Sequence, residues 1–228
     1  NNLMPESYIN SKKNAVEGHV ALILANTIFG LGVPVSKLLL EQWVSPMGYI
    51  VSRSIGAALI FWVIQLFLPR EKVNGKDLIV IIAGGLLGFA ISQTLTAWAL
   101  YYTTPVNFAI LAAMTPIAVL LLTVILRMER ITWLKSIGVI AAIAGALLLA
   151  LPSSDTSIAG QNDKLGIFLA VFAVITWAIS VVMTRKVSAK YSPVTQMKWM
   201  FLVSALVTIP IMLHEGAAQP LYSAAWNW

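Results

Sequence analysis

The sequence predicts an all-α fold, a polytopic transmembrane helix bundle with about seven helices. Of its 228 residues, 59% are hydrophobic and only 11% are charged, whereas a soluble domain carries roughly 25% charged residues. No Asp, Glu, Lys or Arg occurs from Leu78 to Leu126, a run long enough for two helices of about 20 residues each and a turn. The apolar runs are continuous, which excludes barrel strands, because those alternate apolar and polar residues over about 10 residues.

Breaks in the apolar runs predict helices at about 20–40, 45–69, 77–98, 105–126, 131–151, 165–187 and 193–213. The first follows a polar tail, residues 1–16, and continues without a small-residue cleavage site, so we expect an uncleaved anchor rather than a signal peptide. The second opens at Ser45-Pro46, because proline in a first helical turn lacks only an N–H that would be unpaired anyway. The Asn74-Gly75 turn precedes the third.

The later helices are separated in the same way. Residues 101–105 interrupt the long apolar run before the fourth helix, and a charged turn around Glu129 follows it. A polar segment, residues 153–164, separates the fifth helix from the sixth, and Ser192-Pro193 opens the seventh. Helices are expected because every backbone N–H and C=O in lipid must pair within the protein, and a helix achieves this within one segment.

The basic residues predict the orientation of the bundle. If the N-terminus is cytoplasmic, eleven basic residues lie in cytoplasmic segments and only Lys37 and Lys164 lie on the opposite side. The eleven are Lys12, Lys13, Arg70, Lys72, Lys76, Arg127, Arg130, Lys135, Arg185, Lys186 and Lys190. Cytoplasmic loops carry an excess of Lys and Arg, so we expect a multi-pass protein of the plasma membrane (the inner membrane of a bacterium) with a cytoplasmic N-terminus. The net charge of +6 therefore does not indicate a nucleic-acid partner.

The first helical hairpin is similar to the last. Each contains a glycine, an aromatic residue, a hydroxyl followed by a cation, and Ser-Pro, in the same order. These are Gly18, Phe29, Ser36-Lys37 and Ser45-Pro46 in the first hairpin, and Gly166, Trp177, Thr184-Arg185 and Ser192-Pro193 in the last. Because an odd number of helices separates the two starts, the last hairpin enters the membrane from the other side, as in the inverted repeats of secondary transporters.

The repeat predicts the organisation of the chain. We expect one five-helix repeat at 17–152, an external loop at 153–164, and the first hairpin of an inverted second repeat at 165–228. The chain begins Asn1-Asn2 without an initiator Met, and the second unit holds two of five helices. Both features suggest a fragment.

The fourth predicted helix carries the motif AWALYYTTPVNFAILAAMTP, residues 97–116, which resembles the fourth-helix motif of EamA-type transporters in the drug/metabolite transporter superfamily. The Glu129-Arg130 turn and the Gly-rich stretch 138–149 are similar to the segments that follow in that family. The first hairpin of that family also has counterparts in this chain, namely Phe29-Gly30, Lys37, Ser45-Pro46 and Arg53. Phe29 is a departure, because Trp is commoner there. The resemblance covers nearly the whole chain.

This resemblance implies ten helices in two inverted repeats, with both termini cytoplasmic. It also implies a central cavity lined by helices one to four and six to nine. Helices eight to ten are expected to be missing from this chain, and with them half of the cavity wall. Members of the family export amino acids, other metabolites or drugs. The resemblance therefore implies a secondary transporter, an exporter of a small organic solute working by alternating access.

Polar and aromatic side chains within the predicted helices are candidate substrate contacts, because embedded polar residues usually face the bundle interior. The candidates are Asn26, Arg53, Gln93, Trp98, Asn107, Thr115, Trp177 and Ser180. The hydroxyls could instead bond neighbouring helices, and the indoles could anchor the interface. Arg53 could clamp a carboxylate with its planar guanidinium, reach the outer interface, or pair with Glu41.

Other residues have a structural interpretation. Lys198 is expected to extend to the interface, and Gly84 and Gly88 are expected to allow close helix contact. Pro34 and Pro116 could kink the first and fourth helices.

Several classes of function find no support in the sequence. The chain has no cysteine, no His-Glu metal motif and no paired membrane aspartates, so we predict no enzyme, no catalytic residues, no metal and no cofactor. The expected partners are a small-molecule substrate and the lipid bilayer, and a homodimer stays open. The alternative is a seven-helix receptor, or a structural membrane protein without transport activity. A receptor would place the N-terminus outside, against the distribution of basic residues.

Overall fold

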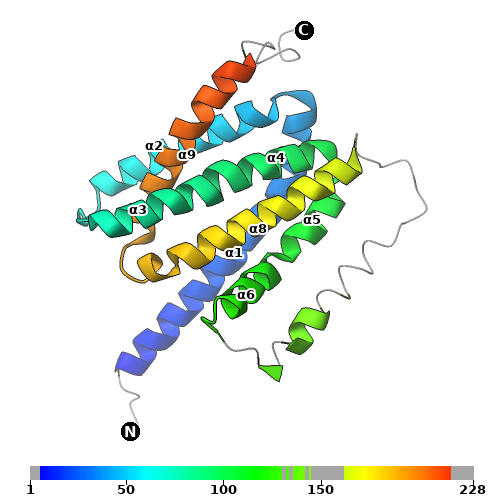
Figure 1. Ribbon diagram of the computed structural model, residues 1–228. Helices are drawn as coiled ribbons and strands as arrows, with labels where there is room; N and C mark the ends of the chain where they lie inside the picture. Colours follow the sequence, from blue (N-terminus) through cyan, green and yellow to red (C-terminus); the bar gives the residue numbers. More distant parts are fainter. Residues whose placement is uncertain (1–5, 130–131, 134–135, 142–143, 145–161, 217–228) are drawn as a thin grey trace.

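The computed structural model describes residues 6–129, 132–133, 136–141, 144 and 162–216, and shows them as a bundle of helices (Figure 1). Six segments among these residues are long and apolar enough to cross a membrane, by length and composition. They are Gly18–Gln42, Pro46–Leu66, Gly75–Tyr102, Pro105–Ile125, Asp163–Ser188 and Pro193–His214. The all-α polytopic membrane fold predicted from the sequence is confirmed. Most of the predicted fifth helix, 131–151, and of the loop 153–164 lies outside the described residues.

The first two helices form a hairpin. Helix α1 (Glu6–Gln42) begins earlier than expected, so residues from Glu6 to 16 belong to a helix rather than to an irregular tail. Pro34 lies inside α1 without ending it. Helix α2 (Pro46–Leu66) begins at the predicted Ser-Pro, where the hydroxyl of Ser45 accepts a hydrogen bond from the Gly48 N–H. This bond satisfies one of the backbone donors left unpaired at a helix start.

The third span is divided into α3 (Gly75–Gly84), a π-helical turn η1 (Gly85–Ile91) and α4 (Ser92–Tyr102). The glycines of this span allow very close contact with two other helices. A side chain at Gly88 would meet Ser180 of α8, and one at Gly85 would lie 2.7 Å from the Cα of Met200 in α9. The predicted close packing at Gly84 and Gly88 is therefore correct, and π-helical turns often occur at functional sites.

The fourth span consists of α5 (Pro105–Ala113) and α6 (Thr115–Ile125), separated at Met114. The predicted kink at Pro116 explains the break, because proline lacks an N–H and its ring clashes with the carbonyl four residues earlier. The hydroxyl of Thr104 caps the start of α5 by accepting a hydrogen bond from the Asn107 N–H.

The last two described helices, α8 (Asp163–Ser188) and α9 (Pro193–Gly216), form the second hairpin. Helix α8 packs along α4, and α9 packs along α2 (Figure 1). At one end of the bundle, Lys37 donates to the carbonyl of Leu100, and Asp163 accepts a hydrogen bond from Thr103. We call this the Lys37 end.

The opposite end, which we call the Arg185 end, contains the α2–α3 and α8–α9 connections and the end of α6. There Arg185 pairs with Glu129, and Lys190 pairs with Asp77. Lys37 and Arg185 occupy similar positions in their hairpins and lie at opposite ends of the bundle, so the two hairpins cross it in opposite senses.

Serine hydroxyls bond the helices together in the centre of the bundle. Ser204 of α9 donates to the carbonyl of Phe89, which leaves Ser54 of α2 to donate to Ser204. Ser180 of α8 donates to the carbonyl of Gly84, and Ser92 donates to the carbonyl of Ala173. Association of helices in lipid relies on such hydrogen bonds and on close packing of small residues, so these contacts hold the two hairpins and the third span together.

Candidate functional site

A cavity of about 530 Å³ lies between α6, η1, α8 and α9. Its wall is mostly apolar and comprises Phe89, Pro116, Val119, Leu120, Trp177, Val181, Val182, Met197 and Met200, with Ser180 and Thr184 among the hydroxyl groups. Small-molecule sites are typically apolar clefts of about 300–1,000 Å³ with a few polar groups. The size and the chemistry of this cavity therefore suit a small organic solute.

Four polar residues at helix ends lie at the Arg185 end of the cavity. They are Glu129, Arg185, Ser188 and Gln196. The guanidinium of Arg185 lies 3.0 Å from the carboxylate of Glu129, and their side chains are 53% and 28% exposed. The ion pair therefore borders the cavity where it approaches the aqueous phase.

Local structure after α6 places Glu129 at this position. Arg127 has a left-handed backbone with φ of 55°, a conformation that commonly ends helices. The N–H of Met128 then donates back to the carbonyl of Thr123, over 2.8 Å. This turn follows the end of α6 and places the carboxylate of Glu129 within ion-pair distance of Arg185 in α8.

Aromatic rings close the inner end of the cavity. The rings of Phe89 and Trp177 meet edge to face, with centroids 5.4 Å apart, and Phe89 also lies 4.5 Å from Phe201. Trp177 and Ser180 were predicted from the sequence as substrate contacts, and both line this cavity. The hydroxyl of Ser180 also bonds the carbonyl of Gly84, so it holds two walls of the cavity together.

Two further predicted residues, Arg53 and Gln93, meet between α2 and α4. The guanidinium of Arg53 donates a hydrogen bond of 3.1 Å to the amide oxygen of Gln93. The alternative pairing of Arg53 with Glu41 does not occur, because Glu41 pairs with Lys37 at 3.1 Å. Gln93 lies four residues after Phe89, which places it one turn beyond the inner end of the cavity.

The other four predicted residues do not line the cavity. Asn26 donates to the carbonyl of Leu22 on the exposed part of α1, and Thr115 donates to the carbonyl of Ala112. Such bonds to the preceding turn are the usual local arrangement of polar side chains in helices. Asn107 and Trp98 lie near the Lys37 end, where Asn107 bonds Thr103 and Trp98 stacks on Tyr102.

Lys198 differs from the prediction that it reaches the membrane interface. Its side chain is buried between α9 and α2, and its ammonium donates to the amide oxygen of Gln65 over 3.0 Å. The ammonium also lies 5.4 Å from the ring centroid of Trp62. Because Trp62 and Gln65 are three residues apart on one helix face, the packing of α9 against α2 gives Lys198 partners inside the protein.

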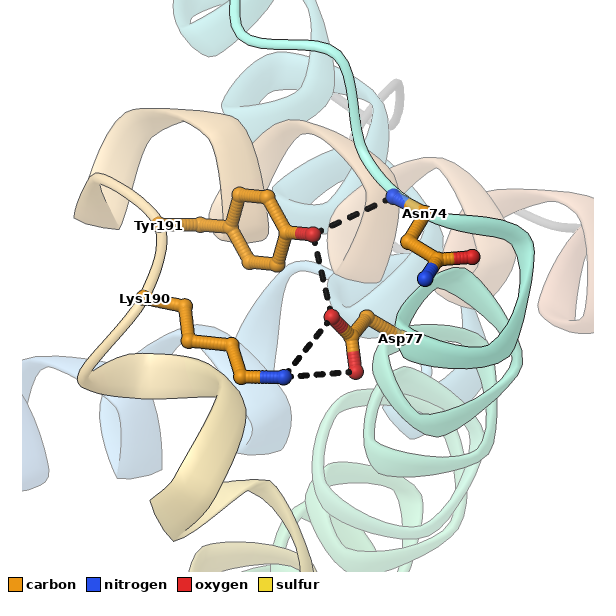
Figure 2. Close-up of polar contacts among 4 residues, drawn as sticks. All are labelled: Asn74, Asp77, Lys190 and Tyr191. Carbon is orange, nitrogen blue, oxygen red and sulfur yellow. Dashed lines mark hydrogen bonds and ion pairs between the residues drawn. The ribbon is translucent and has the colours of Figure 1, made fainter.

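Sequence reasoning also missed the polar contacts between the α8–α9 connection and the start of α3. Figure 2 shows Asp77 accepting hydrogen bonds from Lys190, at 3.1 Å, and from the hydroxyl of Tyr191, at 3.0 Å. The hydroxyl of Tyr191 in turn accepts a bond from the N–H of Asn74. In the sequence these charges indicated only the orientation of the bundle.

A second carboxylate, Glu71, fixes the same connection. It accepts hydrogen bonds from the N–H and the hydroxyl of Ser192. Hydrogen bonds from Thr195 and Ser192 lower the pKa of Glu71 below its ordinary value, because they stabilise the ionised carboxylate. Glu71 and Asp77 together anchor the α8–α9 connection to the α2–α3 connection, beside the cavity.

The model of the EamA-like transporter family matches residues 16–151 and 164–228. A Bacillus subtilis protein named uncharacterized transporter YetK is 24% identical over 90% of this chain and 63% of its own length. An uncharacterized transporter of Archaeoglobus fulgidus is 26% identical over 77% of this chain and 60% of its own length. A Streptantibioticus cattleyicolor protein named probable terminal-alkyne amino-acid exporter is 24% identical over 90% of this chain and 68% of its own length. The chain thus spans about three fifths of the length of the first two relatives.

Proposed function

Because the chain belongs to the EamA-like transporter family, we propose that it forms the solute pathway of a secondary transporter for a small organic molecule, such as an amino acid, another metabolite or a drug. The observation that carries this proposal is the apolar cavity between α6, η1, α8 and α9. Trp177 and Ser180, at its inner part, are the proposed solute contacts, because they add a flat ring and a hydroxyl to an otherwise apolar wall.

The proposed mechanism is alternating access between two inverted repeats. One wall of the cavity comes from the first repeat, through η1 and α6, and the facing wall comes from the second, through α8 and α9. A rigid-body movement of one wall against the other would therefore change which end of the bundle is open. The opposite directions of the two hairpins and the two segments matched by the family model support this arrangement.

We further propose that the N-terminus is cytoplasmic and that the protein exports its solute across the plasma membrane. The Arg185 end carries most of the basic residues of the described connections, which the positive-inside rule assigns to the cytoplasm. The cavity approaches the aqueous phase at that end, so it would take up its solute from the cytoplasm. The relative that is named as an exporter supports the same direction.

A substitution that fills the cavity tests this function. Val119 lines the cavity from α6, whereas Leu121 of the same helix is 44% exposed and outside it. Full-length protein is reconstituted in liposomes and tested for flux of labelled amino acids, of other carboxylate and phosphate metabolites, and of drugs. Val119→Trp is expected to abolish flux by occupying the solute volume, and the matched control Leu121→Trp is expected to keep it.

Two results would contradict the proposal. One is wild-type flux in the Val119→Trp variant, which would show that solute does not use this cavity. The other is absence of solute-dependent flux across the whole panel in correctly folded wild-type protein.

A further inference from the structure

We propose that Arg53 and Gln93 bind the anionic oxygen group, a carboxylate or a phosphate, of the solute. This inference rests on the proposed transport function and specifies the substrate class as organic anions with an apolar body. It requires that the guanidinium lie within the membrane, that its charge lack a protein counter-ion, and that it face a space that a solute can enter.

The guanidinium lies at membrane depth. Arg53 comes seven residues after Pro46, which is about 10 Å along α2 at a rise of about 1.5 Å per residue. Gln93 comes nine residues before Tyr102, about 14 Å from the same end of the bundle. Since Arg53 donates to this deeper residue, its side chain is not extended towards the Lys37 end.

The charge of Arg53 is not neutralised by the part of the chain that the structure describes. Its hydrogen-bond partner there is the neutral amide oxygen of Gln93, and Glu41 is engaged by Lys37. A guanidinium is always protonated and has five N–H donors in a planar fork that matches a carboxylate or a phosphate. Four of the five make no hydrogen bond to a described residue and can bind a bidentate ligand.

Gln93 adds suitable donors beside the guanidinium. Its amide oxygen accepts the bond from Arg53, which turns the two amide hydrogens of the same group away from the arginine. An amide that accepts from a cation and donates to an anion suits a site for a negatively charged group. The pair thus presents N–H donors from two helices, α2 and α4, to one ligand.

The side chain of Arg53 contacts Gln93 of α4 and is otherwise exposed, so it is not buried against α9. Its neighbour Ser54 is buried and bonded to Ser204 of α9, whereas Arg53 is exposed. An exposed cation at membrane depth is costly in lipid and is usually found in a water-filled cavity. The Arg53 side of α2 is therefore best explained as part of the aqueous solute path.

The position of the pair relative to the cavity specifies the shape of the ligand. Phe89 lies at the inner end of the apolar cavity, within the π-helical turn η1. Gln93 lies in the first turn of α4, which continues the same span, so it is about one turn nearer the Lys37 end than Phe89. A solute with an apolar body in the cavity could place its anionic group at Arg53.

A charge-selective labelling experiment tests the site without a known substrate. Ala57, one turn after Arg53 on α2, is replaced by cysteine as the only reactive cysteine of the full-length protein in liposomes. We compare its reaction rates with an anionic sulfonatoethyl and a cationic trimethylammonioethyl methanethiosulfonate. Because a local positive field raises the concentration of anions by about 10-fold or more, Arg53→Gln is expected to lower the anionic-to-cationic rate ratio about 10-fold.

Two variants control for structural effects. Arg53→Lys, which keeps the charge, is expected to preserve most of the ratio, and Lys198→Gln removes another membrane cation and is expected to leave the ratio unchanged. An equal ratio in Arg53→Gln and in the parent would overturn the proposal. So would a cysteine that reacts with neither reagent, because the site must be accessible to solute.

Protection from labelling identifies the anionic group. If benzoate protects the cysteine of Ala57→Cys better than phenyl phosphate does, the anionic group is a carboxylate, and the reverse order assigns a phosphate. Equal protection by neutral benzamide, or no protection by either anion, contradicts the site. Transport by the Val119→Trp variant is scored separately. A ratio that depends on Arg53 together with intact flux in Val119→Trp would refute the cavity and keep the anion site. Loss of flux in Val119→Trp together with a rate ratio that does not depend on Arg53 would refute only the anion site.

Discussion

The contact between Gly85 and α9 predicts a large effect of a single methyl group. In Gly85→Ala the new Cβ would lie 2.7 Å from the Cα and 3.0 Å from the carbonyl oxygen of Met200. These are backbone atoms, so they cannot move aside as a side chain can, and η1 and α9 must separate. Overpacking of a well-packed interface costs about 1–3 kcal/mol.

The gain in helix propensity partly offsets this cost, because Ala is about 1 kcal/mol more favourable than Gly in a helix. Gly56→Ala provides the matched control. Gly56 lies in α2 with no atom within 4 Å of an added Cβ, so it receives the propensity gain alone. The difference between the two variants therefore isolates the steric cost, and Gly85→Ala should be about 1–3 kcal/mol less stable than Gly56→Ala.

The assay is reversible unfolding of the full-length protein in mixed micelles, in which the fraction of denaturing detergent is increased and helix content is followed by circular dichroism. Equal free energies of unfolding for Gly85→Ala and Gly56→Ala would refute the reasoning. That outcome would mean that η1 and α9 are not in backbone contact and that the π-helical turn does not set the position of α9.

Three further predictions concern other contacts. Glu71 has a pKa below its ordinary value of 4.5. Its stabilising contribution is therefore present above that pH and is lost as the pH falls through the lowered pKa. The thermal unfolding temperature of Glu71→Gln should depend less on acid than that of the parent. Ser54→Ala and Ser204→Ala should show a coupling of about 0.6 kcal/mol in a double-mutant cycle of unfolding, and additive effects would contradict their hydrogen bond. In whole cells, an impermeant maleimide should label Lys164→Cys but reach Lys76→Cys only after permeabilisation, and the reverse pattern would invert the proposed orientation.

The helices that cross the membrane were predictable because lipid imposes a local requirement on the backbone. Each span must be apolar over about 20 residues and must pair its own N–H and C=O groups. Both conditions are met within one segment, so the starts at Pro46, Pro105 and Pro193 agree with the structure. The start of α1 at Glu6 was not predicted, because polar residues that extend a helix beyond the apolar run leave no signal of this kind.

The candidate site was only partly predictable. Trp177 and Ser180 were selected as embedded aromatic and polar residues, and they line the cavity. Asn26 and Thr115 were selected by the same criterion and bond the preceding turn of their own helices. Ser180 and Thr115 are both hydroxyl residues within apolar helices, so the sequence alone could not separate a side chain that faces the cavity from one that faces its own backbone.

The sequence by itself determined the fold class, the positions of the spans and the opposite directions of the two hairpins, since these depend on local composition and on the count of crossings. Only the tertiary structure decided which polar groups meet: Arg53 with Gln93, and Lys198 with Gln65. The physical reason is that the rotation and the approach of each helix are set by packing against other helices. At η1, for example, Gly85 lets the backbone of the third span contact the backbone of α9 at Met200.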